Sequence, residues 1–362
     1  MNQWPSWLPL RQNLQELSAY GAPQLPADAV MNTNENPYPP SAALAKAIAD
    51  RISEVALTLN RYPDRDALVL RGKLADFING LSRTKFGSAN VWAANGSNEI
   101  IQSLFMAFGG GTALGFTPSY SMHPLIAKVT QVQWLNGNRR DDFTLDIDSA
   151  IEQIQRDKPT LTFITTPNNP TGSAVTIEEI EKIAKSTSGL LIVDEAYAEF
   201  SDEISAVTLI EKYPHVVVIR TMSKAFAFAG VRLGYLVADP AVVDAMFLVR
   251  LPYHLSALTQ AAGEVALDFK DELLGTVAQL RTDRDRVVAQ LSQMGLSVIP
   301  SASNFLLFSG FKMPSAQLWQ AMLDRGVLIR DVGLLGYLRV TIGNEAENTK
   351  FISTLSLCLG EK

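Results

Sequence analysis

Lys224 is the residue of this sequence whose surroundings most clearly suggest chemistry. It lies in the stretch TMSKAFAFAG, residues 221–230, where its neighbours are small or aromatic. Burying a free ammonium group is costly, and burial lowers the pKa of a lysine, so that its amine becomes available as a nucleophile or base. The stretch therefore indicates covalent chemistry at Lys224. On this stretch alone, a surface lysine at a helix start remains the alternative.

Polar side chains follow four apolar runs of the sequence, at the points where strands would end. The runs are VWAA, TLTFITT, GLLIV and HVVVI. In an open α/β sheet, ligands bind outside the carboxyl ends of the strands, so we expect the residues that follow these runs to meet there. These residues, together with an arginine that follows the Lys224 stretch, are Ser97, Asn98, Asn169, Asp194, Tyr197, Thr221, Ser223, Lys224 and Arg232.

Pyridoxal phosphate is the ligand that needs this set of groups. A turn of small residues that opens a helix binds a phosphate through free N–H groups and the positive end of the helix dipole, and Ser97 and Asn98 occupy such a turn. The ring nitrogen needs a carboxylate, the phenolic oxygen needs donors, and the aldehyde needs a lysine amine. Nucleotide-binding motifs are absent, since Leu114 replaces the third glycine of G-x-G-x-x-G and no P-loop occurs. The G-x-S-x-G motif of a serine nucleophile is absent as well.

A mostly parallel sheet is predicted to position these groups. Apolar runs alternate with helical patterns, which favours strands covered on both faces. One helix is marked by a capping box at Thr176 and Glu179, by a hydrophobic staple of Val175 and Ile180, and by Gly189, placed to end it. The seven strands are predicted in NVWAAN, TALGF, TQVQWL, TLTFITT, GLLIVDEA, HVVVIRT and LGYLVAD.

The chain is predicted to divide into three parts. Residues 1–40 are rich in Pro and Asn and are expected to form an arm that packs with the smaller domain. Residues 41–255 form the large domain that binds the cofactor. Residues 256–362 form a small α/β domain with a long helical stretch and strands in SVIP, NFLLFSG, GVLIRD and YLRVTIG. Whether the arm closes over the site as a lid stays open.

Composition excludes several classes of function. Hydrophobic residues make up 47% and charged residues 19% of the 362 residues, and the net charge of −6 argues against nucleic acid or an anionic membrane as partner. The single cysteine, Cys358, permits no disulfide within the chain, and the three histidines lack metal-site spacing. Neither a signal peptide nor a membrane-spanning run is expected, so we predict a cytoplasmic protein without a metal.

Three segments in fixed order carry a resemblance to a known family. TPNNPTG, VDEAYAEF and MSKAFAFAGVRLGY resemble the motifs of the fold-type I pyridoxal-phosphate aminotransferases, and NTNENPYPP, NRYPD, NGSNEI and LRVTIG extend the resemblance through the whole chain. The resemblance implies an α/β fold in which a mostly parallel seven-stranded sheet lies between helices, next to a smaller α/β domain. It also implies a homodimer that uses pyridoxal phosphate.

The resemblance further implies a role for each site residue. Lys224 bonds to the cofactor aldehyde and then moves the proton of the substrate, while Asp194 pairs with the ring nitrogen. Tyr197 and Asn169 donate to the phenolic oxygen, and Tyr120 of PSYSMHP stacks on the ring. The phosphate is held by Ser97, Asn98, Thr221, Ser223 and Arg232, and Tyr62 of NRYPD reaches the phosphate in the partner subunit.

The substrate is implied by a branch of that family. AYGAPQLP, PSYSMHP and RLPYHLSALTQAA resemble the actinobacterial branch that exchanges an amino group between histidinol phosphate and 2-oxoglutarate, or in reverse between glutamate and imidazole acetol phosphate. Arg339 of YLRVTIG then binds the substrate anion, because a guanidinium suits both carboxylate and phosphate. Weaker candidates for the rest of the pocket are Tyr20, Asn36, Tyr253 and Arg330.

Three other functions remain compatible with the motifs. An aromatic amino-acid aminotransferase would keep the cofactor residues and differ in substrate preference. A decarboxylase of phosphorylated amino acids would release carbon dioxide and need no 2-oxoglutarate. A non-catalytic binding module would be expected to lose Lys224 or Asp194, and both are present.

Overall fold

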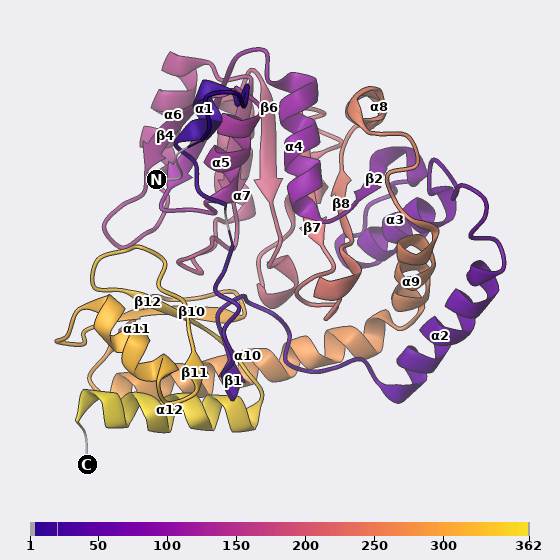
Figure 1. Ribbon diagram of the computed structural model, residues 1–362. Coiled ribbons are helices and arrows are strands. Elements are labelled where there is room, and N and C mark those ends of the chain that lie inside the picture. Colours follow the sequence, from indigo (N-terminus) through magenta and orange to yellow (C-terminus); the bar gives the residue numbers. More distant parts are fainter. Residues whose placement is uncertain (1–3, 20, 361–362) are drawn as a thin grey trace.

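The computed structural model describes residues 4–19 and 21–360, and its centre is a seven-stranded sheet (Figure 1). The strand order is β2-β8-β7-β6-β5-β3-β4. Only β8 runs antiparallel to its neighbours β2 and β7, so the predicted mostly parallel sheet is confirmed, and each of the seven apolar runs forms a strand. The strands are β2 Val91–Ala94, β3 Thr112–Thr117, β4 Gln133–Asn138, β5 Leu161–Thr165, β6 Leu190–Asp194, β7 Val216–Thr221 and β8 Gly234–Val237.

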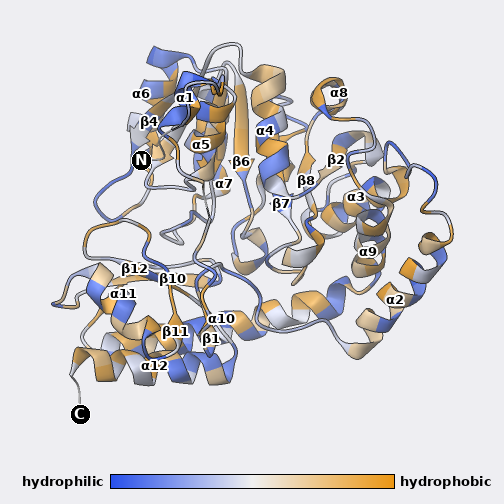
Figure 2. Cartoon of the chain, in the orientation of Figure 1, coloured by the Kyte–Doolittle hydropathy of each residue, from blue (hydrophilic) through white to orange (hydrophobic). Residues whose placement is uncertain are grey.

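Both faces of this sheet are covered by helices, which explains the uninterrupted apolar runs. Every residue of β5 and β7 is buried. Successive side chains of a strand point to opposite faces, so Phe163 joins the hydrophobic cluster on one face and Ile164 joins the cluster on the other. Figure 2 shows β6 coloured hydrophobic at the centre, while the helices around the sheet carry both hydrophobic and hydrophilic residues.

Helices fill the connections between strands and build the outer layers. The α-helices are α1 Gln12–Gln15, α2 Ala42–Ala56, α3 Leu68–Ser82, α4 Ser97–Phe108, α5 Met122–Val129, α6 Ile147–Asp157, α7 Ile177–Ser186, α8 Pro240–Val249, α9 Ala257–Asp268, α10 Lys270–Gln293, α11 Ser315–Leu323 and α12 Glu345–Leu359. The short 3-10 helices are η1 Ser88–Asn90, η2 Ala198–Phe200, η3 Ala206–Leu209 and η4 Ala229–Val231.

Helix α7 begins as the sequence predicts but does not end as predicted. Thr176 accepts from the Glu179 N–H and Glu179 accepts from the Thr176 N–H, which confirms the capping box. The prediction that Gly189 ends the helix is wrong, because α7 already ends at Ser186. A Cβ on Gly189 would lie 2.4 Å from the Thr160 carbonyl oxygen, so the glycine serves the close approach of the chain to β5.

The C-terminal part of the chain forms a second, smaller layer below the main sheet (Figure 1). Its antiparallel sheet has the order β12-β10-β9, and the parallel pair β1-β11 lies beside it. Helix α9 packs against α2 and α3, while the long helix α10 contacts β9, β10 and α12. The division of domains at residue 256 stays a prediction. The strands of this second layer are β1 Ala29–Val30, β9 Ser297–Val298, β10 Phe305–Ser309, β11 Val327–Leu328 and β12 Leu338–Thr341.

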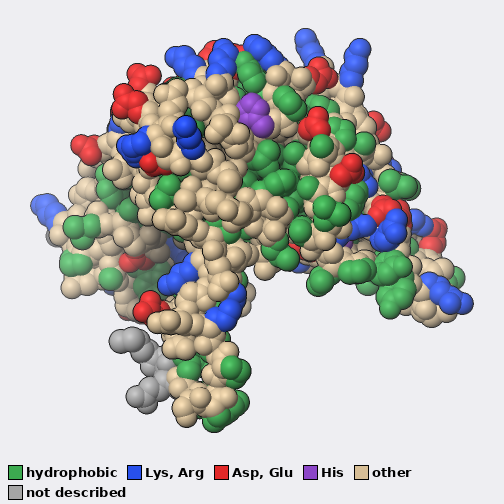
Figure 3. Space-filling model, turned by 90° about the horizontal axis from the view of Figure 1, so that it is seen from above, with side chains coloured by type: hydrophobic (Ala, Val, Ile, Leu, Met, Phe, Trp, Pro, Cys, Tyr) green, Lys and Arg blue, Asp and Glu red, His purple; other side chains and the backbone are tan. Residues whose placement is uncertain are grey.

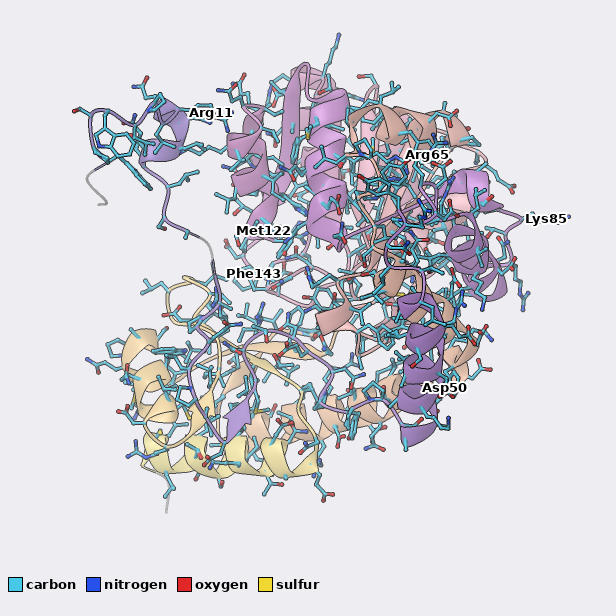
Figure 4. All side chains as sticks on the ribbon, turned by 45° about the vertical axis from the view of Figure 1, so that its right-hand side comes forward. Arg11, Asp50, Arg65, Lys85, Met122 and Phe143 are labelled. Atoms are coloured by element: carbon cyan, nitrogen blue, oxygen red, sulfur yellow. The ribbon has the colours of Figure 1, made fainter. Side chains whose placement is uncertain are left out.

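The N-terminal arm contacts both layers. Arg11 and Asn13 donate to the carbonyl oxygens of Val129 and Lys128 at the end of α5, a contact that the sequence did not predict. Further along, β1 pairs with β11 of the C-terminal layer. Figures 3 and 4 show the first part of the arm projecting from the body of the molecule. Among the described residues, no helix is both long and apolar enough to cross a membrane.

Candidate active site

A cavity of about 410 Å³ lies between the carboxyl ends of the main sheet and the C-terminal layer. This is the place where open α/β sheets bind their ligands. The arm also reaches it, since residues 32–35 line the cavity together with strand-end residues. The predicted residues that the structure brings together in its wall are Ser97, Asn98, Tyr120, Asn169, Asp194, Tyr197, Thr221, Ser223, Lys224, Arg232, Arg330 and Arg339.

Lys224 follows the end of β7 and points into this cavity. Its Nζ donates to the Thr33 carbonyl oxygen at 2.9 Å. Burial lowers the pKa of the Lys224 amine from 10.5 to about 8, and the positive charge of Arg339 lowers this pKa further in the same direction. A larger fraction of the amine is therefore uncharged near neutral pH than for an exposed lysine, as a nucleophile or base requires.

Asp194 closes strand β6 and is 2% exposed. Its Oδ1 accepts from the Ala196 N–H at 3.2 Å, and its Oδ2 lies 3.0 Å from Nε2 of His123. His123 comes from α5, is itself buried, and packs on the Phe163 ring at 4.8 Å between centroids. His123 is not among the residues predicted from the sequence, because the histidines were considered there only as metal ligands. The available signal was its position three residues after Tyr120 in the same motif.

The N-terminus of α4 forms a turn suited to an anion. Helix α4 begins at Ser97, directly after Gly96, whose φ of +84° favours glycine. A Cβ on Gly96 would lie 2.8 Å from Nη2 of Arg232, so the guanidinium sits against the turn. A Cβ on Gly234 would lie 2.6 Å from the Ser97 nitrogen, which shows how closely β8 approaches. Free N–H groups, the helix dipole and Arg232 together favour a phosphate here.

A chain of hydrogen bonds joins the other polar groups of the wall. The Tyr197 hydroxyl accepts from the Asn34 amide at 2.9 Å and from the Asn169 amide at 3.5 Å. Asn169 in turn accepts from Nη1 of Arg339 at 2.6 Å. The Tyr120 hydroxyl donates to Asn98 at 3.2 Å. Asn34 was not among the predicted residues, since it comes from the arm, 163 positions before Tyr197.

Two arginines bring positive charge to the cavity from the C-terminal layer. Arg339 of β12 donates to the Asn32 carbonyl oxygen at 2.7 Å, and its guanidinium lies 5.2 Å from the Phe305 ring centroid. Arg330 is joined to Arg339 by two backbone hydrogen bonds of 2.9 Å. The pairing fixes both side chains on the same side of the cavity, where a dianionic group would meet two guanidinium groups.

Three predicted residues that the structure describes lie elsewhere. The Asn36 amide donates to the Thr276 hydroxyl at 2.9 Å and lines a neighbouring cavity instead. Tyr62 and Tyr253 stack on each other at 4.3 Å on the molecular surface, away from the cavity of their own chain. Tyr20 lies outside the described residues. Their proposed roles in substrate and partner-subunit contacts therefore stay predictions.

A buried cluster of charged side chains lies beside the site. It includes the residues next to Asp194 and Thr221 in the sequence. Arg220 lies 2.8 Å from a Glu195 oxygen and 2.9 Å from a Glu199 oxygen, and all three side chains are almost fully buried. Glu195 also accepts from the Ser205 hydroxyl and the Ala206 N–H. Burial raises the pKa of Glu199, opposed by the charge of Arg220. The cluster ties the ends of β6 and β7 together.

The groups that line the cavity fit pyridoxal phosphate. The turn at Ser97, flanked by Arg232, suits its phosphate, and the buried Asp194 carboxylate suits a protonated ring nitrogen. Tyr197 suits the phenolic oxygen, and the Lys224 amine suits the aldehyde. In the described ranges, no group of three or more His, Cys, Asp or Glu side chains is placed to hold a metal ion.

The known proteins that this chain resembles in sequence are aminotransferases. Residues 29–355 match the family model of aminotransferase class I and II. The chain is 55% identical over 350 residues to the histidinol-phosphate aminotransferase of Mycolicibacterium smegmatis, covering 96% of this chain and 92% of the relative. It is 55% identical over 348 residues to that of Corynebacterium glutamicum strain R, covering 95% of each.

A solved structure shows the same fold. The histidinol-phosphate aminotransferase of Sinorhizobium meliloti, in complex with pyridoxal-5'-phosphate, matches with a TM-score of 0.85 and 22% identity, over 97% of this chain and 98% of that one. The predicted fold, a mostly parallel seven-stranded sheet between helices with a smaller α/β layer, is confirmed by this match and by the strand order.

Proposed function

Because this chain belongs to the aminotransferase class I and II family, we propose that it transfers an amino group between glutamate and imidazole acetol phosphate in histidine biosynthesis. The family predicted from the sequence is thereby confirmed, and its cofactor is pyridoxal phosphate. The observation that carries the proposal is the convergence of Arg330 and Arg339 on the cavity that holds Lys224. The 55% identity to two histidinol-phosphate aminotransferases supports the choice of substrate.

Each part of the cofactor has residues that would hold it. Ser97, Asn98 and Arg232 would hold the phosphate at the N-terminus of α4, with Thr221 and Ser223 beside them. Asp194 would keep the ring nitrogen protonated, since His123 and the Ala196 N–H fix its carboxylate. When bound, pyridoxal phosphate supplies an electron sink and a carbonyl group that exchanges its amine partner.

Lys224 is the residue that moves the proton. Its lowered pKa leaves a larger neutral fraction to accept the α-proton of the bound amino acid, and the Thr33 carbonyl oxygen orients the amine. Arg339 would hold the substrate anion and thereby place the α-carbon near this amine. The same guanidinium accommodates the carboxylate of glutamate and the phosphate of histidinol phosphate, because it forms paired hydrogen bonds with both.

A homodimer is part of this proposal. Large hydrophobic side chains are exposed at the end of α2, in the loop that follows it, and at the end of α8, and the stacked Tyr62 and Tyr253 belong to the same surface. Exposed large apolar side chains on one surface are typical of interfaces. A second copy that covers this surface would bring Tyr62 to the partner's cofactor phosphate. The exposed side chains are Leu57, Leu59, Tyr62, Leu248, Leu251 and Tyr253.

We also propose a cytoplasmic location for the protein.

The substrate assignment is tested by single-turnover spectroscopy of the loaded protein. Histidinol phosphate and phenylalanine are mixed separately with the protein while the cofactor absorbance is followed. Conversion with histidinol phosphate should be faster by at least roughly tenfold, because phenylalanine offers no phosphate to the two arginines. A matched Arg339→Leu variant should lose that advantage. A faster reaction with phenylalanine would contradict the proposal and favour an aromatic amino-acid aminotransferase.

A further inference from the structure

His254 and Asn95 form a reciprocal clamp beside the phosphate-binding turn. The His254 ring lies with Nε2 3.0 Å from the Ala93 carbonyl oxygen, in the last part of β2. In the opposite direction, the Asn95 amide donates to the His254 carbonyl oxygen at 2.9 Å. Two hydrogen bonds of opposite sense therefore join the loop between α8 and α9 to the segment that leads into α4.

The contact defines which ring nitrogen of His254 carries a proton. Nε2 faces a carbonyl oxygen, which only accepts, so Nε2 must be the donor. Nδ1 is buried and has no hydrogen-bond partner among the described residues. The ring also stacks on the buried indole of Trp92, at 5.4 Å between centroids and 17° between planes. Its orientation is thus set by packing as well as by the hydrogen bond.

The clamp holds the backbone directly before the anion site. Asn95 follows β2 and precedes Gly96, whose positive φ turns the chain so that α4 starts at Ser97. The Asn95 N–H donates to a Glu99 carboxylate oxygen of the first helical turn at 2.5 Å. Any shift of Asn95 would therefore move the N–H groups at the start of α4, because the close approach of Gly234 to the backbone of Gly96 and Ser97 limits movement on the other side.

We propose that His254 is a positioning residue for the cofactor phosphate: it acts through Ala93 and Asn95 to fix the turn at the start of α4. The inference rests on the proposed function, because it takes pyridoxal phosphate as the ligand of that turn. His254 does not line the cavity. Its effect should appear in the binding of the phosphate group and not in the binding of the ring.

The test compares two ligands that differ only in the phosphate. Cofactor-free protein is titrated with pyridoxal phosphate and, separately, with pyridoxal, and the dissociation constants are measured from tryptophan fluorescence. His254→Ala should weaken pyridoxal phosphate binding by roughly tenfold, the effect of losing one well-placed hydrogen bond. Pyridoxal binding should change by less than about twofold, because the ring site is untouched. His254→Gln, whose amide donates to the same carbonyl oxygen, should restore most of the affinity.

His215→Ala is the matched control. Its Nε2 also lies 3.0 Å from a backbone carbonyl oxygen, that of Ala184, and its ring is also half-buried, but it is remote from the cavity. The control should leave both dissociation constants unchanged. If His254→Ala does not fold, Asn95→Ala removes the other arm of the clamp and should give the same selective loss.

The outcomes separate this inference from the proposed function. Equal loss of affinity for both ligands in His254→Ala, or the same loss in His215→Ala, would mean a general structural effect and would overturn the inference. Unchanged binding of pyridoxal phosphate in both His254→Ala and Asn95→Ala would also overturn it. Failure of the unaltered protein to bind pyridoxal phosphate at all would instead refute the proposed function.

Discussion

Replacing Lys224 with methionine should stabilise the cofactor-free protein at neutral pH. The ammonium group of Lys224 is buried near Arg339, and the pKa of the amine is lowered to about 8 for that reason. Methionine keeps most of the apolar stem and removes the charge. Such a gain from deleting a functional residue is expected where a site holds a group that the fold alone does not favour.

The size of the effect follows from the two pKa values. The difference between 10.5 in the unfolded chain and about 8 in the folded chain corresponds to about 3 kcal/mol. We take about 2 kcal/mol as the expected gain, because the Lys224 side chain keeps a small solvent-exposed fraction, so that water screens part of the charge. The lost hydrogen bond to Thr33 subtracts a term of about 1 kcal/mol that does not depend on pH.

The direction in which the stability difference between Lys224→Met and the unaltered protein changes with pH tests this explanation. Between pH 8 and 10.5 the unfolded chain binds the Lys224 proton and the folded chain does not, so the stability of the unaltered protein rises with pH in that window. The advantage of Lys224→Met should therefore be largest below pH 8, at about 1 kcal/mol once the lost hydrogen bond is subtracted, and should turn into a deficit of about 1 kcal/mol as the pH approaches 10.5.

Urea unfolding of the cofactor-free proteins at a series of pH values measures this difference. Lys85→Met is the control, because Lys85 is exposed (Figure 4) and its replacement should give a difference that stays constant with pH. A stability difference between Lys224→Met and the unaltered protein that stays flat from pH 7 to pH 10.5 would refute the reasoning.

Three further substitutions test other parts of the site. Asp194→Asn should leave the cofactor bound but slow turnover by roughly a hundredfold or more, because the ring nitrogen loses its counter-charge; kinetics equal to those of the unaltered enzyme would contradict this. Gly96→Ala should weaken cofactor binding and lower the melting temperature, with a cost of about 1–3 kcal/mol, because the new Cβ meets Arg232 and φ is positive; an unshifted melting curve would count against it. Arg220→Met should destabilise the fold by about 3–5 kcal/mol, since it leaves two buried carboxylates unpaired, and thermal unfolding would show whether that loss occurs.

The sequence predicts those site residues that stand at or soon after the end of a buried strand. Asp194 is the last residue of β6 and Lys224 follows β7, and a parallel sheet brings the ends of neighbouring strands together, so their meeting in one cavity follows from order alone. Ser97 is predictable for the same reason, because a small-residue turn after a strand opens a helix. For these residues, the local sequence pattern is enough to predict the position in the fold.

Residues whose position depends on contacts between distant segments could not be predicted in this way. Asn34 reaches Tyr197 only because the arm crosses the C-terminal layer. Asn36, two residues later, turns the other way and bonds to Thr276 of α10, which no local pattern reveals. Gly189 looked like a helix stop, yet the approach of the Thr160 carbonyl oxygen explains it, and that contact joins two strands.

The pairing of β1 with β11 has a consequence for synthesis of the protein on the ribosome. Ala29 pairs with Val327, so strand β1 stays without its partner until all the residues between them have been made. At about 5–20 residues per second, that wait lasts on the order of 15–60 s. Arg339, which binds the Asn32 carbonyl oxygen, is translated later still. The main sheet can form on the nascent chain before β11 and Arg339 are made, but the cavity is completed only after them, so cofactor loading should follow formation of the main sheet.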